Sequence, residues 1–542
     1  MTDKRANVVV DASQNQGELS HNWTYIGYDE INYTYTPEGK ALLGKFGDLQ
    51  DQPYYVRAHH LLCTGNCHGF YKWGSTNAYL EDEAGNPGYD WTFVDLVFDT
   101  LLENHCKPFV ELGFMPQDLV DAERYDSEKN QTYRTYGWAC PPKDYDKWYE
   151  LIFRLVEHCK ARYGQQEIAS WYWELWNEPD LDYYWKGSLD EFNKLYDYTV
   201  AAVKAACPEA RVGGPGTTNP VHGNKSAQYL DGFLKHCASG TNYYTGQKGT
   251  PLDFVSFHVK GGGYRADPLH RKQNPPSVKQ ILSHTQNGYE IISRYPGFKE
   301  LECVLSEIDP DGWAAGGAWD NANLNFRNTE YYPSFVATAF HKVSRFAKEK
   351  NWDLKLLSWA FLFVGERCFE GTRSFSTQGI DKAIFNLFKI YAQMGAQQVS
   401  LESSLAKNPL AYSDLWGKGE TADIAGMATL ADERLAILLY NHHDNWDDAG
   451  QYEIELEIKH LPFKKQLLSL KHYRIDATHS NAYAEWLRQA KPMYPSAEQA
   501  DTMKEKSGLE LLEPPQTLTL HKGGLVLTFT MPVHSLSLLL VE

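Results

Sequence analysis

Trp171-Tyr-Trp-Glu-Leu-Trp-Asn-Glu-Pro-Asp180 is the stretch that decides the fold, because it predicts a strand that ends in a polar turn. Its bulky aromatic and aliphatic side chains are typical of a buried strand. Pro179 has no backbone N–H and cannot continue the hydrogen-bond ladder of a sheet. The strand therefore ends near Asn177 and Glu178. In a barrel of parallel strands, this carboxyl end is where catalytic groups gather.

Outward from this strand, apolar runs alternate with segments of helical period, which is the signature of β-α units around a parallel sheet. The predicted strands are Trp23–Tyr28, Tyr54–His59, Pro108–Phe114, Trp171–Trp176, Arg211–Gly214, Phe254–His258, Val304–Glu307 and Leu356–Phe361. The predicted helices are Lys40–Phe46, Thr92–Glu103, Lys143–Tyr163, Leu189–Ala206, Ser226–Cys237, Ser277–Ser293, Glu330–Glu349 and Lys382–Met394. Eight such units predict an α/β fold, the (β/α)8 TIM barrel.

After about residue 400 the apolar period changes from helical to two, which predicts an antiparallel β-sandwich. Its predicted strands are Leu435–Asn441, Tyr452–Ile458, Gln466–Ile475, Thr517–Leu520, Leu525–Thr530 and Ser535–Val541. Val8–Asp11 is a further strand that joins this sandwich from the N-terminus. We therefore expect an N-terminal strand in residues 1–15, a catalytic barrel in 16–400 and a β-sandwich accessory domain in 401–542. No flexible linker separates the domains, so we expect them to pack firmly.

Composition narrows the class of protein. Of the 542 residues, 42% are hydrophobic and 23% are charged, as in a soluble globular protein. The net charge of −18 disfavours nucleic acid as a partner, because phosphate binding depends on Lys and Arg. No run of 18 apolar residues predicts a membrane helix, so we expect no membrane partner.

The expected compartment is the cytoplasm. Met1–Gln14 lack the apolar stretch of a signal peptide, although a leader removed beforehand would leave the same pattern. The nine cysteines are scattered and odd in number, which suits a reducing compartment better than a disulfide scaffold.

A second carboxylate occupies the equivalent place on another strand. Cys303-Val-Leu-Ser-Glu-Ile308 puts Glu307 at the end of the seventh predicted strand, and Asp309-Pro310 opens a loop. A single strand-end Glu is more often a loop salt bridge, but Glu178 and Glu307 form a pair across the barrel mouth. Retaining glycosidases use two carboxyl groups about 5–5.5 Å apart. The aromatic surroundings of Glu178 are of the kind that raises the pKa of a general acid.

The motifs identify a family. Trp176-Asn-Glu-Pro179 resembles glycoside hydrolase clan A, and nearly the whole chain resembles glycoside hydrolase family 39. The resemblance also rests on Tyr55–Leu62, Phe109–Pro116, Val212–Pro215 and Tyr494–Gln499. It implies a barrel with a β-sandwich, net retention at the anomeric carbon, and neither metal nor cofactor.

The resemblance also assigns roles by position. It implies that Glu178 is the acid/base, that Glu307 is the nucleophile, and that Asn177 binds the sugar 2-hydroxyl. It places His59 and His258 at the substrate and Trp359 under the bound sugar, with Phe114 and Glu366 at further pocket positions. From the residues alone, His258 is a satisfied core histidine and Trp359 is barrel filling.

Because of Lys260, the sequence does not decide which sugar the site binds. In the family's β-xylosidases an aromatic residue stands at this position, whereas a lysine resembles the α-L-iduronidases, where it holds a uronate carboxylate as a point charge. Glu307–Trp313 also resembles the iduronidases. Against this, Glu366 repels a carboxylate, and Phe361–Thr377 resembles the bacterial xylosidases. Lys260 has a simpler role if it pairs with Glu366 or Asp309.

We therefore predict a retaining exo-acting β-D-xylosidase that releases xylose from the non-reducing end of xylo-oligosaccharides. The alternatives are α-L-arabinosidase or α-L-iduronidase activity on the same scaffold, and a transglycosylase with the same two glutamates. The expected partner is an oligosaccharide or small glycoside, and homo-oligomer formation stays open.

Two readings from other classes are weaker. His59–His68 contains three His and two Cys, and Cys63 with Cys67 resembles half of a zinc site, but no second pair follows. A non-catalytic carbohydrate-binding protein on a decayed barrel is disfavoured because decay usually removes one carboxylate, and both are present.

Overall fold

The computed structural model describes residues 4–68, 74–121, 123–126, 133, 137–263, 269, 271–312, 317–319, 321–360, 365–371, 373–408 and 421–542. Trp313 and Phe361, which belong to stretches quoted above, lie outside the described residues.

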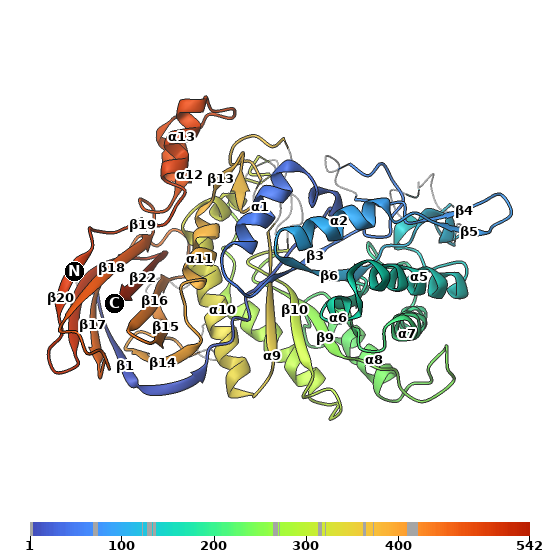
Figure 1. Cartoon of the computed structure of the whole chain (residues 1–542), viewed down its shortest axis with the longest axis horizontal. Coiled ribbons are helices and arrows are strands. Elements are labelled where there is room, and N and C mark those ends of the chain that lie inside the picture. The colour runs from blue at the N-terminus through green and yellow to red at the C-terminus, as the bar shows by residue number, and fades with distance from the viewer. Residues whose placement is uncertain are drawn as a thin grey trace.

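Eight parallel strands close into a barrel on the right of Figure 1, in the order β10-β11-β2-β3-β6-β7-β8-β9. They are β2 (Tyr25–Tyr28), β3 (Tyr54–Ala58), β6 (Cys106–Leu112), β7 (Tyr172–Leu175), β8 (Arg211–Thr217), β9 (Phe254–Lys260), β10 (Glu302–Asp309) and β11 (Leu354–Trp359). Each predicted barrel strand overlaps one of these, and the TIM-barrel prediction is confirmed.

Helices surround the barrel. The main ones are α1 (Pro37–Gly47), α2 (Thr92–Glu103), α5 (Tyr145–Tyr163), α7 (Leu189–Ala206), α8 (Lys225–Ser239), α9 (Val278–Ile292), α10 (Tyr331–Glu349) and α11 (Ala383–Tyr391). Shorter elements at the loops include β4 (Tyr79–Glu81), β5 (Pro87–Tyr89), α3 (Glu123–Asp126), α6 (Gln165–Ala169), β12 (Ser376–Thr377) and β13 (Ile380–Asp381). Local sequence explains where two of the helices begin. Asp144 accepts hydrogen bonds from the first backbone N–H groups of α5, and Ser188 with Glu191 forms a capping box on α7.

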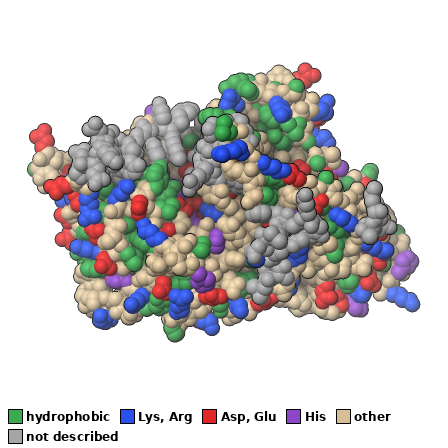
Figure 2. Space-filling model, turned by 180° about the vertical axis from the view of Figure 1, so that it is seen from behind, with side chains coloured by type: hydrophobic (Ala, Val, Ile, Leu, Met, Phe, Trp, Pro, Cys, Tyr) green, Lys and Arg blue, Asp and Glu red, His purple; other side chains and the backbone are tan. Residues whose placement is uncertain are grey.

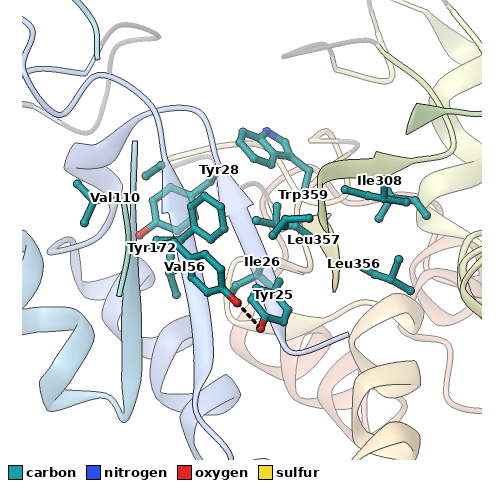
Figure 3. Close-up of a cluster of buried hydrophobic side chains, with 14 of the residues drawn as sticks. Tyr25, Ile26, Tyr28, Val56, Val110, Tyr172, Ile308, Leu356, Leu357 and Trp359 are labelled. Atoms are coloured by element: carbon teal, nitrogen blue, oxygen red, sulfur yellow. Dashed lines mark hydrogen bonds between the residues drawn. The ribbon is translucent and has the colours of Figure 1, made fainter. Parts of the chain in front are cut away.

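The barrel interior is a packed aromatic and aliphatic core. Tyr25 and Tyr172 meet inside it with their hydroxyl oxygens 3.0 Å apart. Figure 3 shows this pair near the start of the strands, with Trp359 at the other end of the group. The polar groups of the site lie on the same end as Trp359, because parallel strands all finish there.

The second domain is a curled, mostly antiparallel sheet with the order β19-β18-β22-β16-β15-β14-β1-β17-β21, and β20 pairs with β18. Its strands are β1 (Arg5–Glu18), β14 (Gln397–Ser403), β15 (Asp423–Ala431), β16 (Arg434–His442), β17 (Gln451–Lys459), β18 (Leu467–Ile475), β19 (Glu510–Leu511), β20 (Gln516–Thr519), β21 (Leu525–Pro532) and β22 (Ser535–Val541). Their alternating inward side chains form a second hydrophobic core. The sandwich prediction is confirmed.

The N-terminal strand β1 lies between β14 and β17, antiparallel to the first and parallel to the second. Both chain termini therefore lie in the sandwich (Figure 1). The domain boundaries at 15/16 and 400/401 stay predictions, and β1 and β14 each run across one of them.

A helical insertion projects from the sandwich between β18 and β19, at the top left of Figure 1. It consists of α12 (Ala482–Arg488) and α13 (Ala497–Glu505), which the sequence analysis did not predict. Trp486 packs on Phe369 of a barrel loop, so the insertion contacts and supports that loop. Figure 2 shows apolar side chains on the insertion, where Tyr494 is 74% exposed.

Helix α10 joins the two domains. It packs against β15, β16 and β22, and one continuous hydrophobic core includes residues of the barrel and of these strands. Inside this contact the Lys342 ammonium lies 3.0 Å from Asp423, and both side chains are at most 1% exposed. The domains therefore share a dry interface.

We expect Lys342→Met to lower the free energy of unfolding by about 3–5 kcal/mol, because it removes the ammonium group that pairs with the buried Asp423 carboxylate. Urea unfolding measures this. The matched control is Lys465→Met, which breaks an exposed pair with Glu433 and should change stability by less than about 0.5 kcal/mol. Equal losses in the two variants would contradict the role of the interface pair.

Candidate active site

The two predicted glutamates lie at the same end of the barrel. Glu307 is within β10, and Glu178 follows β7. Glu178 has a φ of 46°, a left-handed conformation that is unfavourable for a side chain of this kind. Its backbone N–H donates to the carbonyl of Gly216 at 2.8 Å, which holds the strained turn in place. In this turn the carboxylate lies beside His258 of β9, with its Oε1 2.9 Å from Nδ1.

His258 lies between the two carboxylates. Its Nδ1 is 2.9 Å from Oε1 of Glu178 and 3.8 Å from Oε2 of Glu307. Contacting atoms of all three side chains lie within 4.8 Å of one another. This upper limit between the nearest atoms is compatible with the carboxyl separation of about 5–5.5 Å in retaining glycosidases.

Cations surround Glu307. Arg57 Nη1 lies 3.3 Å from Oε1, and Lys260 Nζ lies 2.6 Å from Oε2. Burial acts to raise the pKa of Glu307, but the charges of His258, Lys260 and His59 outweigh it and hold that pKa well below its usual range. Glu307 is therefore an ionised carboxylate at neutral pH, the state that a nucleophile needs.

Arg57 is the centre of the buried charge network, and the sequence analysis assigned it no role. Its fully buried guanidinium contacts Glu174 at 2.5 Å and Glu111 at 2.9 Å, besides Glu307. It also donates to Oδ1 of Asn177 at 3.1 Å, so the amide –NH2 is the end of Asn177 left to donate to a ligand. A signal was present, because a charged residue inside an apolar barrel strand requires a partner.

His59 is held by the same network. Its Nδ1 lies 2.6 Å from Glu111, and its Nε2 lies 3.6 Å from Glu307. Burial by itself lowers the pKa of His59, but the two carboxylates raise it to about 10. The imidazole is therefore protonated at neutral pH and adds a third positive charge beside the Glu307 carboxylate.

Lys260 pairs with Asp309, one of its two predicted partners. Its Nζ is 2.5 Å from Oδ2 of Asp309, and the residue is 5% exposed. Among the described residues, no ion pair joins it to Glu366. Burial raises the pKa of Glu366 to about 7 although Lys382 opposes this, so Glu366 is only partly ionised at neutral pH. Its repulsion of a substrate carboxylate is correspondingly weak.

Trp359 and Phe114 are completely buried. Trp359 Nε1 donates to Asp29 at 3.0 Å, and Gly27 lies against the ring so closely that a Cβ there would be 2.4 Å from it. Phe114 packs on Trp138 and Trp176. Their contact with a sugar stays a prediction, and both rings already serve as packing.

Tyr184 is a further site residue that the sequence analysis did not single out. Burial raises its pKa, and the carboxylates of Glu178, Asp29 and Glu307 act in the same direction because they lie close to the phenol. Its ring stacks on Phe114 with centroids 5.7 Å apart. Only the loop after β7, which is folded back over the mouth, brings it there.

The zinc reading of Cys63 and Cys67 finds no support. Within the described part of the chain, the only group of side chains close enough to share a metal ion is Glu178, His258 and Glu307. All nine cysteines are buried free thiols. Among the described helices, none is long and apolar enough to cross a membrane.

The raised pKa of His59 makes stability pH-dependent. Because the folded pKa is about 10 and the ordinary value is 6.5, its stabilising contribution is complete below pH 6.5 and is lost as pH rises toward 10. At pH 6 we expect the wild type to be more stable than the His59→Gln variant, with a difference in the free energy of unfolding on the order of a few kcal/mol. This difference should become smaller as the pH approaches 10. Urea unfolding across this range measures it. His222→Gln, at a histidine whose side chain is 56% exposed, is the control; a difference for His59 that does not vary with pH would refute the charged imidazole.

Comparisons with known proteins identify the family of the chain. The model of the family "Glycosyl hydrolases family 39" matches residues 6–511. The chain is 25% identical to a β-xylosidase of Geobacillus stearothermophilus over 83% of its own length and 79% of that protein. It is also 25% identical to the α-L-iduronidase of Mus musculus, over 83% and 68% of the two lengths.

Two solved structures have the same fold. A bacterial orthologue of human α-L-iduronidase superposes with a TM-score of 0.79 at 21% identity, covering 99% of this chain and 84% of the other. A monomeric β-xylosidase from Caulobacter crescentus CB15 gives 0.77 at 19% identity, covering 99% of both. Since the family model spans nearly the whole chain, the protein belongs to glycosyl hydrolase family 39 and is a glycosidase that acts on a carbohydrate substrate.

Proposed function

We propose that the protein is a retaining, exo-acting β-D-xylosidase in which Glu178 is the acid/base and Glu307 is the nucleophile. The observation that carries the proposal is the contrast between two close carboxylates. The charges of His258, Lys260 and His59 keep Glu307 ionised, and Arg57 also lies 3.3 Å from it. Glu178 contacts the imidazole of His258 at 2.9 Å.

The reaction follows from these positions. Glu307 attacks the anomeric carbon while Glu178 donates a proton to the glycosidic oxygen, and the bond to the leaving group breaks. A glycosyl ester on Glu307 results. Glu178, now a carboxylate, takes a proton from water as the water attacks the anomeric carbon, and the bond from this carbon to Glu307 breaks. This releases the sugar with retained configuration and restores both side chains. A sugar hydroxyl in place of water gives transglycosylation.

A neutral pentose fits the charges of the site. Xylose is preferred because the match covers 79% of the β-xylosidase of Geobacillus stearothermophilus but 68% of the α-L-iduronidase of Mus musculus. Arg57, His59 and Lys260 each already have a carboxylate of the protein as partner. A uronate would compete with those carboxylates for the same cations. α-L-Arabinosides are the neutral alternative.

α-L-Iduronide cleavage is the second candidate. The observation that favours it is Lys260, an ammonium group at the nucleophile where a substrate carboxylate would find a charge partner. The iduronidase relatives and their fold are compatible with it.

Cytoplasmic location is also part of the proposal. Its support is the set of nine buried thiols, which suits a reducing compartment. Cell fractionation tests it, and recovery from the periplasm or the medium would reject it.

Glu307→Ala should lower kcat by at least about 10³-fold, and Glu178→Ala should do so mainly for substrates with poor leaving groups. Azide added to Glu307→Ala should yield the sugar azide of inverted configuration, and azide added to Glu178→Ala the retained one. NMR of the products distinguishes them. Gln117→Ala, on a loop at the barrel rim, is the matched control. Wild-type turnover in Glu307→Ala would reject the nucleophile assignment.

A panel of chromogenic β-xyloside, α-L-arabinosides, β-galactoside and α-L-iduronide tests the sugar. We expect the largest kcat/KM for the β-xyloside, because no cation has to be freed for it. A dominant iduronide rate would establish the second candidate and leave the two-glutamate mechanism in place.

A further inference from the structure

An ion pair next to Glu307 has a geometry that points to a further role. Lys260 and Asp309 are direct neighbours on the adjacent strands β9 and β10. The Lys260 ammonium touches both Asp309, at 2.5 Å, and Glu307, at 2.6 Å. The side chains of all three are at most 7% exposed. Glu307 therefore shares its nearest ammonium with a second carboxylate.

Asp309 is itself fixed from the other side. Its Oδ1 accepts from the backbone N–H of Trp359 on β11 at 3.3 Å, while Oδ2 faces Lys260. The carboxylate is thus held between three barrel strands. The charges of Lys260, Arg373 and Arg327 overcome burial and lower the pKa of Asp309, so it is ionised.

We propose that Asp309 is a positioning residue for the nucleophile, which acts by sharing the charge of Lys260 with Glu307 throughout the reaction. The proposal rests on Glu307 being the nucleophile of the proposed function.

The physical reason is a change of charge during catalysis. Glu307 is an anion in the free enzyme and a neutral ester in the glycosyl-enzyme. An ammonium group buried beside Glu307 alone would lose its counter-charge when the ester forms, which is strongly unfavourable in a dry site. Asp309 keeps Lys260 paired in both states. It also reduces the pull of Lys260 on Glu307, so the carboxylate stays available for attack.

The opposite oxygen of Glu307 has the same arrangement. Arg57 lies near Oε1, and Glu111 and Glu174 keep this guanidinium paired whatever the state of Glu307. Each side of the nucleophile thus has a cation with a permanent second partner. A substrate carboxylate held by Lys260 would have to share the ammonium with both Glu307 and Asp309.

Opposite effects of the two residues follow. Removing the cation with Lys260→Met favours the neutral ester over the carboxylate, so the glycosyl-enzyme accumulates and kcat and KM fall together. Asp309→Asn removes the second carboxylate, so the Lys260 ammonium interacts more strongly with ionised Glu307. Formation of the neutral ester is then disfavoured, and kcat/KM falls by about tenfold or more.

The pH profile of kcat/KM gives a second readout. Several titratable or charged groups face Glu307. They are Arg57 in β3, His59 directly after β3, Glu178 and Tyr184 in the loop after β7, His258 and Lys260 in β9, and Asp309 in β10 itself. Lys260→Met should shift the acidic limb of the kcat/KM profile to higher pH by about one pH unit or more, because the positive charge that stabilises the Glu307 carboxylate has been removed. Asp309→Asn should not raise it.

The experiment uses the full-length chain and the most active glycoside of the panel, with burst kinetics and pH profiles. Asp423→Asn is the matched control, because Asp423 forms a comparable buried pair with Lys342, at 3.0 Å, in the interface between the domains. It should lower stability without moving the limb. If a single variant fails to fold, Lys260→Met combined with Asp309→Asn removes both charges, leaves neither unpaired, and should retain activity with a raised limb.

The proposal would be overturned if Lys260→Met and Asp309→Asn both moved the acidic limb of the kcat/KM profile in the same direction. An unchanged limb in the double variant would also overturn it. Loss of iduronide cleavage alone in Lys260→Met, with neutral glycosides unaffected, would show that Lys260 serves the substrate instead. Failure of the proposed function is distinguished separately, because it appears as wild-type turnover in Glu307→Ala.

Discussion

The buried guanidinium of Arg57 is the contact on which the site depends. It touches Glu111, Glu174, Glu307 and the amide of Asn177, so one side chain links strands β3, β6, β7 and β10. A charge taken out of water is tolerated only with partners of opposite sign and good geometry. Here the partners include the carboxylate and the amide closest to the chemistry. The fold and the reactive groups therefore constrain each other through the same buried charge.

Around this centre, positive and negative charges alternate. Arg57, His59 and Lys260 lie next to Glu307, and Glu111 and Asp309 lie behind them. In the proposed mechanism, this arrangement lets Glu307 lose its charge without leaving a cation unpaired. Glu178 lies in a turn with a positive φ beside His258, and the proposed mechanism assigns it the proton exchange with the glycosidic oxygen and with water.

Several features were predictable because they depend on local sequence. The period of the apolar residues places a strand or a helix without reference to the rest of the chain, and the strand-end positions of Glu178 and Glu307 follow from Pro179 and Asp309-Pro310. The barrel and the sandwich were therefore foreseen. The helices α12 and α13 were missed because their short amphipathic pattern lies inside a region that read as strands and loops.

The sequence by itself determined the fold class, the family and the two strand-end glutamates, because these depend on residue type and spacing along the chain. Only the tertiary structure decided the partners of Lys260, the central place of Arg57, the burial of Trp359 and the arrival of Tyr184 at the mouth. The physical reason is that charge pairing and burial depend on distances between strands far apart in sequence. Asp309 meets Lys260 across 49 positions, and Arg57 meets Glu307 across 250. Closing the barrel is what brings them into contact.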